Sequence, residues 1–153
     1  MLAAVAGTLH GLVSVYWGLG GRWLLDTLGE RIVTAFAGLE WVLLPVGAVK
    51  LAGALVPLWL DRHDWPAGRL WRPLCWLGAG GLVLWGGLNA VGALLTLSGV
   101  VTVDDPDRAG LIGHAFLWDP LFALWGVALA IGLWRTRSAR EVSGVATTDG
   151  AAA

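Results

Sequence analysis

The chain has 153 residues, of which 57% are hydrophobic and 14% are charged, and its formal net charge at pH 7 is −1. A soluble domain is about 25% charged, so the composition excludes a disordered chain and an ordinary soluble enzyme, and the lack of a basic excess excludes a nucleic-acid partner. The single cysteine, Cys75, excludes an internal disulfide framework and a paired-cysteine metal or redox site. The composition therefore predicts a small integral membrane protein.

Four apolar segments are each long enough to cross a bilayer, which takes roughly 20 mostly apolar residues. We predict membrane spans over about residues 2–19, 32–60, 74–103 and 111–134. No Lys or Arg precedes Arg22, and no small-residue cleavage pattern ends the first segment. We therefore interpret that segment as a retained span and not as a signal peptide.

The connections between these spans contain their own signals. Residues 22–31 form an amphipathic segment that we expect to lie along the outer membrane surface. The second span is long enough to tilt or to bend at Pro45. Asp105 and Pro106 could start the last helix early, as its N-cap and first helical residue. Within that helix, Pro120 removes a backbone donor and predicts a kink.

The expected architecture is an all-α, four-transmembrane-helix bundle. Residues 1–137 form the membrane domain, and residues 138–153, which are small and polar, form a disordered cytoplasmic tail. Small residues at helical spacing, above all Gly7 and Gly11, are expected to pack the four helices against one another. A dedicated dimer face is the alternative use of these residues.

Arginine residues predict the orientation. Loop 61–72 and the tail after residue 134 contain three Arg each, whereas the two opposite connections together contain three Arg and five acidic residues. Because the arginine-rich side of a membrane protein is usually cytoplasmic, we predict that both termini are cytoplasmic. The 11 Trp residues fit membrane helices, since Trp favours the membrane–water boundary.

Each predicted span carries one polar side chain near the membrane midplane, in chain order His10, Lys50, Asn89 and Asp119. A central lysine costs about 2.5–3.5 kcal/mol on insertion scales, so Lys50, the only lysine, needs a partner. Glu40 is ten residues away on the same predicted helix, too far for direct pairing. We hypothesise a Lys50–Asp119 pair that Asn89 and His10 bridge or flank. The alternative is that Lys50 snorkels to the cytoplasmic interface.

A second polar set lies nearer the outside and comprises Tyr16, Glu40 and His114. Glu40 and His114 are either solvated or form a proton-carrying pair, since histidine titrates near neutral pH. His10 has the alternative of bonding to a backbone carbonyl or to Ser14. The histidines and acids have no metal-ligand spacing, so we expect no metal and no cofactor. No enzyme motif occurs, and we lean against an enzyme.

Three stretches of the chain resemble a known family. They are residues 13–21 (VSVYWGLGG) with 25–29 (LDTLG), residues 48–53 (AVKLAG), and residues 113–122 (GHAFLWDPLF) with 124–126 (LWG). In these stretches the chain is similar to the domain-of-unknown-function 3995 family of small bacterial membrane proteins. The resemblance covers about residues 4–135, with one departure, since residues 18–19 are usually smaller and Ala-rich in that pattern.

The resemblance implies a four-span protein of the bacterial inner membrane and no activity that could be transferred. It also implies that several polar and aromatic residues belong to the family pattern, namely Tyr16, Trp17, Lys50, His114, Trp118 and Asp119.

Our leading functional hypothesis is an outward-facing aromatic and polar pocket that binds a lipophilic or cationic small molecule. Its expected lining is Tyr16, Trp17, Glu40, His114, Trp118 and Asp119, with Lys50 below. One alternative is a subunit of a transporter or a proton relay through Asp119, Lys50 and His10. Others are a membrane enzyme for a lipid-like substrate, with His114 or Glu40 as acid–base, and a structural protein without a ligand. The expected partners are membrane lipid, that small molecule and, as an alternative, further copies of the chain.

Overall fold

The structure is a computed structural model that describes residues 1–149, with side chains described as far as Thr136. Residues 1–149 contain helices and no strand, so the all-α prediction is confirmed. The elements are α1 (Leu2–Gly18), η1 (Leu25–Leu28), α2 (Glu30–Ala35), η2 (Glu40–Val42), α3 (Leu43–Arg62), α4 (Gly68–Leu97), α5 (Arg108–Gly113), η3 (His114–Trp118) and α6 (Asp119–Asp149).

Three helical stretches are long and apolar enough to cross a membrane: Glu40–Arg62, Gly68–Leu97 and Arg108–Thr136. The apolar helix α1 is shorter, at 17 residues. Only 17% of the most apolar window of α3 and of α4 is buried inside the chain. A large exposed apolar surface of this kind is typical of helices that face lipid, so the chain is a membrane protein.

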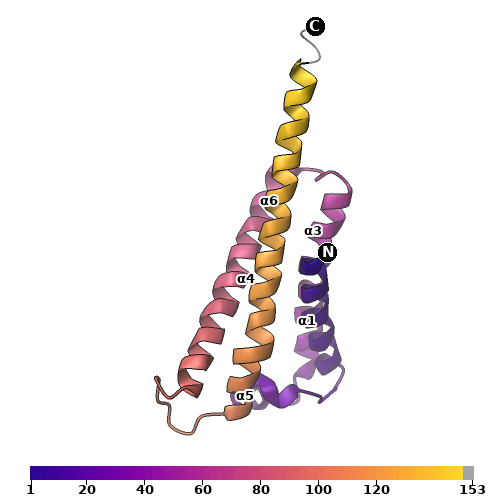
Figure 1. Cartoon of the computed structure of the whole chain (residues 1–153). Coiled ribbons are helices and arrows are strands. Elements are labelled where there is room, and N and C mark those ends of the chain that lie inside the picture. The colour runs from indigo at the N-terminus through magenta and orange to yellow at the C-terminus, as the bar shows by residue number, and fades with distance from the viewer. Residues whose placement is uncertain (150–153) are drawn as a thin grey trace.

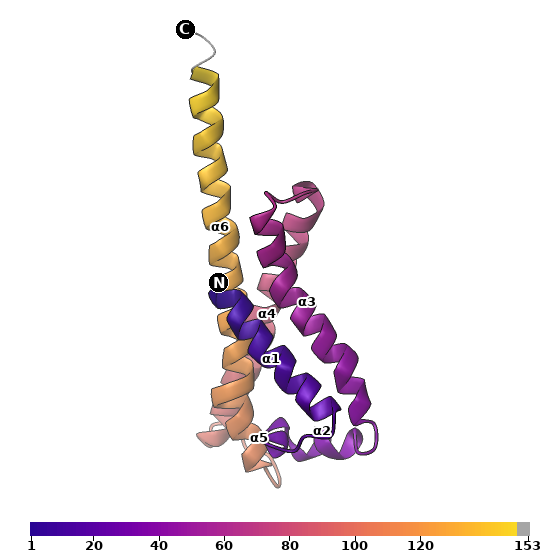
Figure 2. The same cartoon turned by 90° about the vertical axis from the view of Figure 1, so that its right-hand side faces the viewer.

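The long helices form a row in the order α3, α1, α6, α4, because α1 packs against both α3 and α6, and α4 packs against α6 (Figures 1 and 2). Glycines allow these close approaches. A Cβ atom on Gly11 would collide with Leu51 of α3, and one on Gly126 would collide with α4 at Ala79. Gly7 likewise faces Trp125 and Ala54. Small residues thus pack helices within the chain, as predicted.

Two predicted spans have different boundaries. The second helix starts at Leu43 after η2, because the chain turns at Gly38, where φ is +79°. Pro45 therefore lies in the first turn of α3, where a backbone N–H has no helical partner anyway. The third helix covers 68–97 instead of 74–103 and ends before Gly99 (φ +77°). Its early start accommodates Arg72, which donates to the Leu133 carbonyl at 2.6 Å.

The last span also begins differently from the prediction. Asp107, not Asp105, is the N-cap of α5, and its carboxylate accepts a hydrogen bond from the Gly110 N–H at 3.0 Å. The predicted kink region contains the π-helical segment η3, which directly precedes Asp119 and Pro120. Since Pro120 cannot donate a backbone hydrogen bond, this departure from the α-helical ladder occurs where the sequence weakens it.

The end of α6 overlaps the predicted tail. Residues 138–149 are described as helical backbone without side chains, and residues 150–153 lie outside the described part of the chain. The disordered tail expected over residues 138–153 stays a prediction.

Candidate functional site: an acidic cleft beside a histidine–aspartate pair

A cleft of about 920 Å³ lies between the η1–α2 segment and the connection from α4 to α5, at the end of the molecule where α5 lies (Figure 1). Four carboxylate side chains line it: Glu30, Asp104, Asp105 and Asp107. One guanidinium, that of Arg31, lines it as well. Apolar side chains complete much of the wall, among them Leu28, Ile32, Val103 and Leu111. The cleft therefore combines apolar surface with an excess of acidic groups.

Asp107 holds the two sides of this cleft together. Its carboxylate accepts hydrogen bonds from the N–H of Gly110 at the start of α5 and from the N–H of Glu30 at the start of α2. These two backbone donors lower the pKa of Asp107 below its usual value of about 4. The side chain is therefore ionised at neutral pH and fixes α2 to α5.

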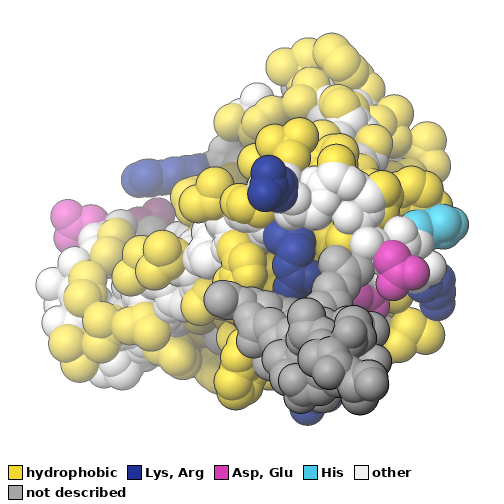
Figure 3. Space-filling model, turned by 90° about the horizontal axis from the view of Figure 1, so that it is seen from above, with side chains coloured by type: hydrophobic (Ala, Val, Ile, Leu, Met, Phe, Trp, Pro, Cys, Tyr) yellow, Lys and Arg dark blue, Asp and Glu magenta, His cyan; other side chains and the backbone are white. Residues whose placement is uncertain are grey.

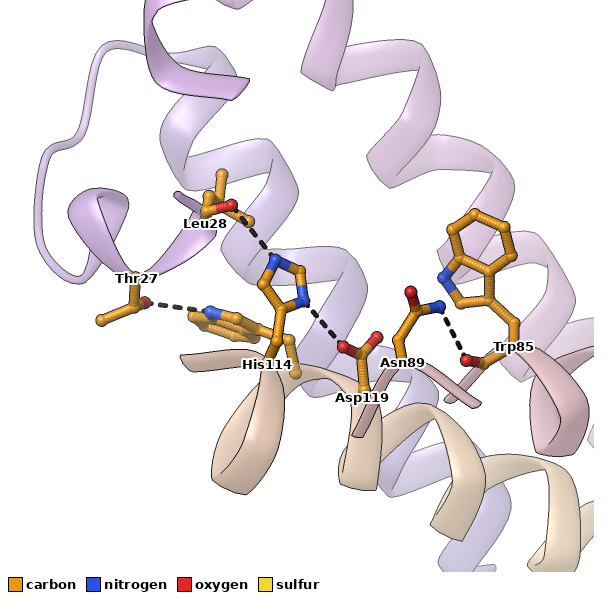
Figure 4. A network of polar contacts seen from close by, with 7 residues as sticks. Thr27, Leu28, Trp85, Asn89, His114 and Asp119 are labelled. Carbon is orange, nitrogen blue, oxygen red and sulfur yellow. Dashed lines mark hydrogen bonds and ion pairs between the residues drawn. The ribbon is translucent and has the colours of Figure 1, made fainter. Parts of the chain in front are cut away.

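His114 connects the cleft to the interior. Its Nδ1 atom lies 2.7 Å from Oδ2 of Asp119, and its Nε2 atom lies 3.2 Å from the Leu28 carbonyl oxygen (Figure 4). His114 lines the cleft, whereas Asp119 is only 2% exposed. Both partners of the ring are acceptors, and only the imidazolium form can donate to both at once. The arrangement thus accommodates a positive ring beside a buried carboxylate.

The π-helical segment makes this pair possible. Residues five apart point about 140° away from each other in a regular α-helix, at 100° per residue. A π-helix has more residues per turn, so η3 turns His114 and Asp119 toward the same side. The pairing therefore depends on a local geometry that helical spacing alone would exclude.

Two buried tryptophans lie behind the cleft. Trp118 is 3% exposed and donates from Nε1 to Oγ1 of Thr27 at 2.9 Å, and Trp17 is 2% exposed and donates to the Trp23 carbonyl at 2.9 Å. Their rings pack edge to face, with centroids 5.0 Å apart. They anchor the 22–29 segment on the helices and do not line the cleft.

The remaining two residues of the expected pocket lie elsewhere. The Tyr16 hydroxyl accepts a hydrogen bond from the Trp23 N–H at 3.3 Å, and its side chain is exposed. Glu40 accepts from the Gly38 N–H at 3.1 Å and lines a separate groove of about 140 Å³. The structure therefore gathers His114, Asp119, Trp118 and Trp17, and leaves Tyr16 and Glu40 apart. No pairing of Glu40 with His114 occurs among the described contacts.

Deeper in the molecule, Lys50 contacts α1. Its Nζ donates to Oγ of Ser14 at 2.8 Å, lies 3.2 Å from Nδ1 of His10, and lies 5.3 Å from the centre of the Phe122 ring. The described contacts of Lys50 do not include Asp119, whose carboxylate instead lies 2.7 Å from Nδ1 of His114. The hypothesised Lys50–Asp119 pair is therefore wrong, and so is snorkelling, because the amine ends on the buried Ser14.

His10 is 3% exposed, and its ring lies against Phe122 and Trp118, with centroid separations of 3.9 and 5.7 Å. Because Nδ1 faces the Lys50 ammonium and accepts from it, Nε2 carries the proton of the neutral ring. Among the described residues, Nε2 has no hydrogen-bond partner. The bond from His10 to Ser14, one of the two predicted alternatives, does not form through the ring, since Ser14 donates to the backbone carbonyl of His10.

Asn89 does not join the Lys50 cluster. Its side chain is exposed on α4, and its amide donates to the Trp85 carbonyl one turn earlier at 2.8 Å (Figure 4). Among the residues whose side chains are described, no group of three or more His, Cys, Asp or Glu side chains could hold a metal ion. The polar interior is thus divided into the Lys50–His10–Ser14 cluster and the His114–Asp119 pair.

Sequence reasoning missed the acidic wall and the Thr27 and Leu28 contacts. The acidic wall had a signal, because Asp104, Asp105 and Asp107 stand together in a short connection between apolar segments. No signal in the sequence indicated that the fold brings Glu30 opposite these residues.

Comparison with known proteins identifies the family to which the chain belongs. No curated protein and no solved structure matches the chain significantly. A family model described as "Protein of unknown function (DUF3995)" matches residues 7–129. The match includes both polar groups, from His10 to Asp119, and most of the ordered helices. The chain belongs to the DUF3995 family.

Proposed function

We propose that the chain is a four-span protein of the bacterial inner membrane with both termini in the cytoplasm. The 17-residue helix α1 would be the first span, at the lower limit of spanning length. Its place between α3 and α6 supports this role. Arg62, Arg69, Arg72 and Arg135 all lie near the other end from the acidic cleft, and Figure 3 looks onto that arginine-bearing end. The positive-inside rule then puts the cleft outside the cell.

We propose that the outer cleft binds a lipophilic cation. The observation that supports this most is the combination of four carboxylates against one guanidinium with an apolar wall, in a volume of about 920 Å³. Pockets for small molecules commonly have volumes of 300–1,000 Å³ and mostly apolar walls. Clefts lined by one sign of charge also concentrate ligands of the other sign.

Within this proposal the residues have separate roles. Asp104 and Asp105, which are exposed and make no described contact, would attract the cation. Leu28 and Ile32 would contact its apolar body. Asp119 would balance the charge of His114, so that the histidine does not repel the ligand.

The test uses two ions of the same shape and opposite charge, tetraphenylphosphonium and tetraphenylborate. Their binding would be measured by equilibrium dialysis against the protein in lipid nanodiscs, with empty nanodiscs as the blank. We expect saturable binding of the cation, one per protein, and only non-saturable partition of the anion. Equal behaviour of the two ions would contradict the proposal.

A proton relay is a second candidate, favoured by one specific observation. His10 contacts Lys50 through Nδ1, and its Nε2 has no hydrogen-bond partner among the described residues. The His10 ring packs against Trp118 and Phe122. A histidine in this form can accept a proton at one nitrogen and release one from the other. In liposomes, a relay predicts proton flux that Lys50→Met and Asp119→Asn each abolish, and flux retained in both variants would exclude it.

We further propose that two copies associate through one face of α4. Gly78, Gly81 and Gly92 share this face with Asn89, and a Cβ atom on any of the three glycines would meet nothing within 4 Å. Elsewhere in this chain, glycines of the long helices often mark a helix crossing. The Asn89 amide keeps one N–H and its oxygen free, and two copies related by a two-fold axis could pair these groups.

A further inference from the structure

A second hollow, of about 220 Å³, lies near the arginine-bearing end of the molecule. It lies between α3 and α6, and the first turn of α1 forms its floor. Small apolar residues supply much of the lining, including Ala3, Ala4, Ala54, Ala128 and Gly132. Asp61, Arg135 and Thr136 form a polar rim. We call this hollow the inner groove.

The packing of the helices explains the inner groove. Both α3 and α6 pack on α1, and they approach each other mainly through the side chains of Trp125, Leu129 and Leu133. Where the facing residues are alanine and glycine, no side chain fills the space. A Cβ atom on Gly132 would meet nothing within 4 Å. The inner groove is therefore an apolar hollow flanked by two helices that are apolar and long enough to span a membrane.

We propose that the inner groove binds one phospholipid, with an acyl chain in the groove and the headgroup at its polar rim. The groove lies between two helices that are long and apolar enough to span a membrane, and apolar hollows are poor sites for water. Arg135 makes no described contact and suits a lipid phosphate. Asp61 uses Oδ1 to accept from Nε1 of Trp65 at 3.1 Å and retains Oδ2 for a headgroup amine. A phosphate and an amine together identify phosphatidylethanolamine as the best match.

The experiment measures lipid retention by native mass spectrometry. The protein is delipidated in detergent and then incubated with palmitoyl-oleoyl phosphatidylethanolamine or with the corresponding phosphatidylglycerol, which lacks the amine. Gly132→Leu fills the groove, and Gly80→Leu is the matched control, because its Cβ also meets open space but lies on α4, away from the groove and from the proposed face between copies. Arg135→Gln removes the rim cation, with Arg69→Gln as its control.

We expect one phosphatidylethanolamine per wild-type chain and weaker retention of phosphatidylglycerol. Gly132→Leu should reduce retention at least ten-fold and Gly80→Leu should not. Arg135→Gln should weaken retention of both lipids, while Arg69→Gln leaves it unchanged. Equal retention in Gly132→Leu and wild type would overturn the proposal, as would a wild-type chain that retains neither lipid. Circular dichroism of each variant verifies its fold. Lipid retention in the inner groove does not depend on the outer cleft. A failure of this proposal can therefore be distinguished from a failure of the proposed cation site.

Discussion

Removing two charges from the outer cleft gives the sharpest test of cation binding. The double variant Asp104→Asn/Asp105→Asn replaces two carboxylates by amides of nearly the same size. Neither carboxylate makes a described contact, so the fold should not change. Asp105 has φ +50°, and asparagine tolerates this left-handed conformation well. The variant therefore changes charge with little change in shape.

The magnitude follows from Coulomb's law. Both carboxylates are exposed, so the effective dielectric constant lies nearer that of water than that of a protein interior. At about 6 Å from a bound cation, each contributes about 0.5–1 kcal/mol. Losing both weakens binding by about 1–2 kcal/mol, which corresponds to about 5–30-fold in Kd.

The assay is equilibrium dialysis of tetraphenylphosphonium against nanodiscs at low ionic strength. The difference between wild type and the double variant should shrink at about 1 M salt, where the screening length falls to about 3 Å. Tetraphenylborate uptake should stay the same or rise. An unchanged Kd for the cation at low salt would refute the assignment of these carboxylates to ligand binding.

Three further predictions concern stability and assembly. Asp107→Ala should destabilise the protein by about 1–2 kcal/mol in detergent, because a helix cap is lost. Since backbone donors lower the pKa of Asp107, its contribution to stability should be complete above the unfolded pKa of about 4 and should disappear as the pH falls through the folded pKa. Identical acid unfolding of the wild type and the variant would contradict this. Lys50→Met should leave the melting temperature unchanged or raise it, because no carboxylate pairs with this buried amine in the described contacts; a loss of about 3 kcal/mol or more, typical of a broken buried ion pair, would show otherwise. In a Cys75→Ser background, Gly81→Cys should form an intermolecular disulfide in membranes and Gly80→Cys, on the opposite side of α4, should not; equal cross-linking would exclude the proposed face.

The sequence predicts the long helices well and their ends poorly. Residues 32–39 are apolar enough to read as part of a span, yet Gly38 turns the chain there, because hydropathy measures composition and not backbone geometry. The third helix starts before its predicted position and includes Arg72, whose side chain donates hydrogen bonds to Thr136 and to the Leu133 carbonyl of α6. A hydropathy pattern contains no such tertiary contact.

For the candidate site, the sequence predicted the depth of each polar residue along its helix but not the direction in which its side chain points. His10 and Lys50 share a level in the membrane, and the structure pairs them. Asp119 lies near that level too, but the π-helical segment turns it toward His114. The rotation of each helix about its axis, which decides these pairings, depends on packing at positions such as Gly11 and Gly47 and does not follow from spacing alone.

The most direct test of the central claim, that the outer cleft holds a lipophilic cation, is native mass spectrometry of the protein released from nanodiscs made from its host membrane. We expect a reproducible added mass of a small cationic molecule, distinct from phospholipid, which tetraphenylphosphonium displaces and whose retention Asp104→Asn/Asp105→Asn weakens. A chain that carries no such mass and does not retain tetraphenylphosphonium would rule out cation binding in the outer cleft.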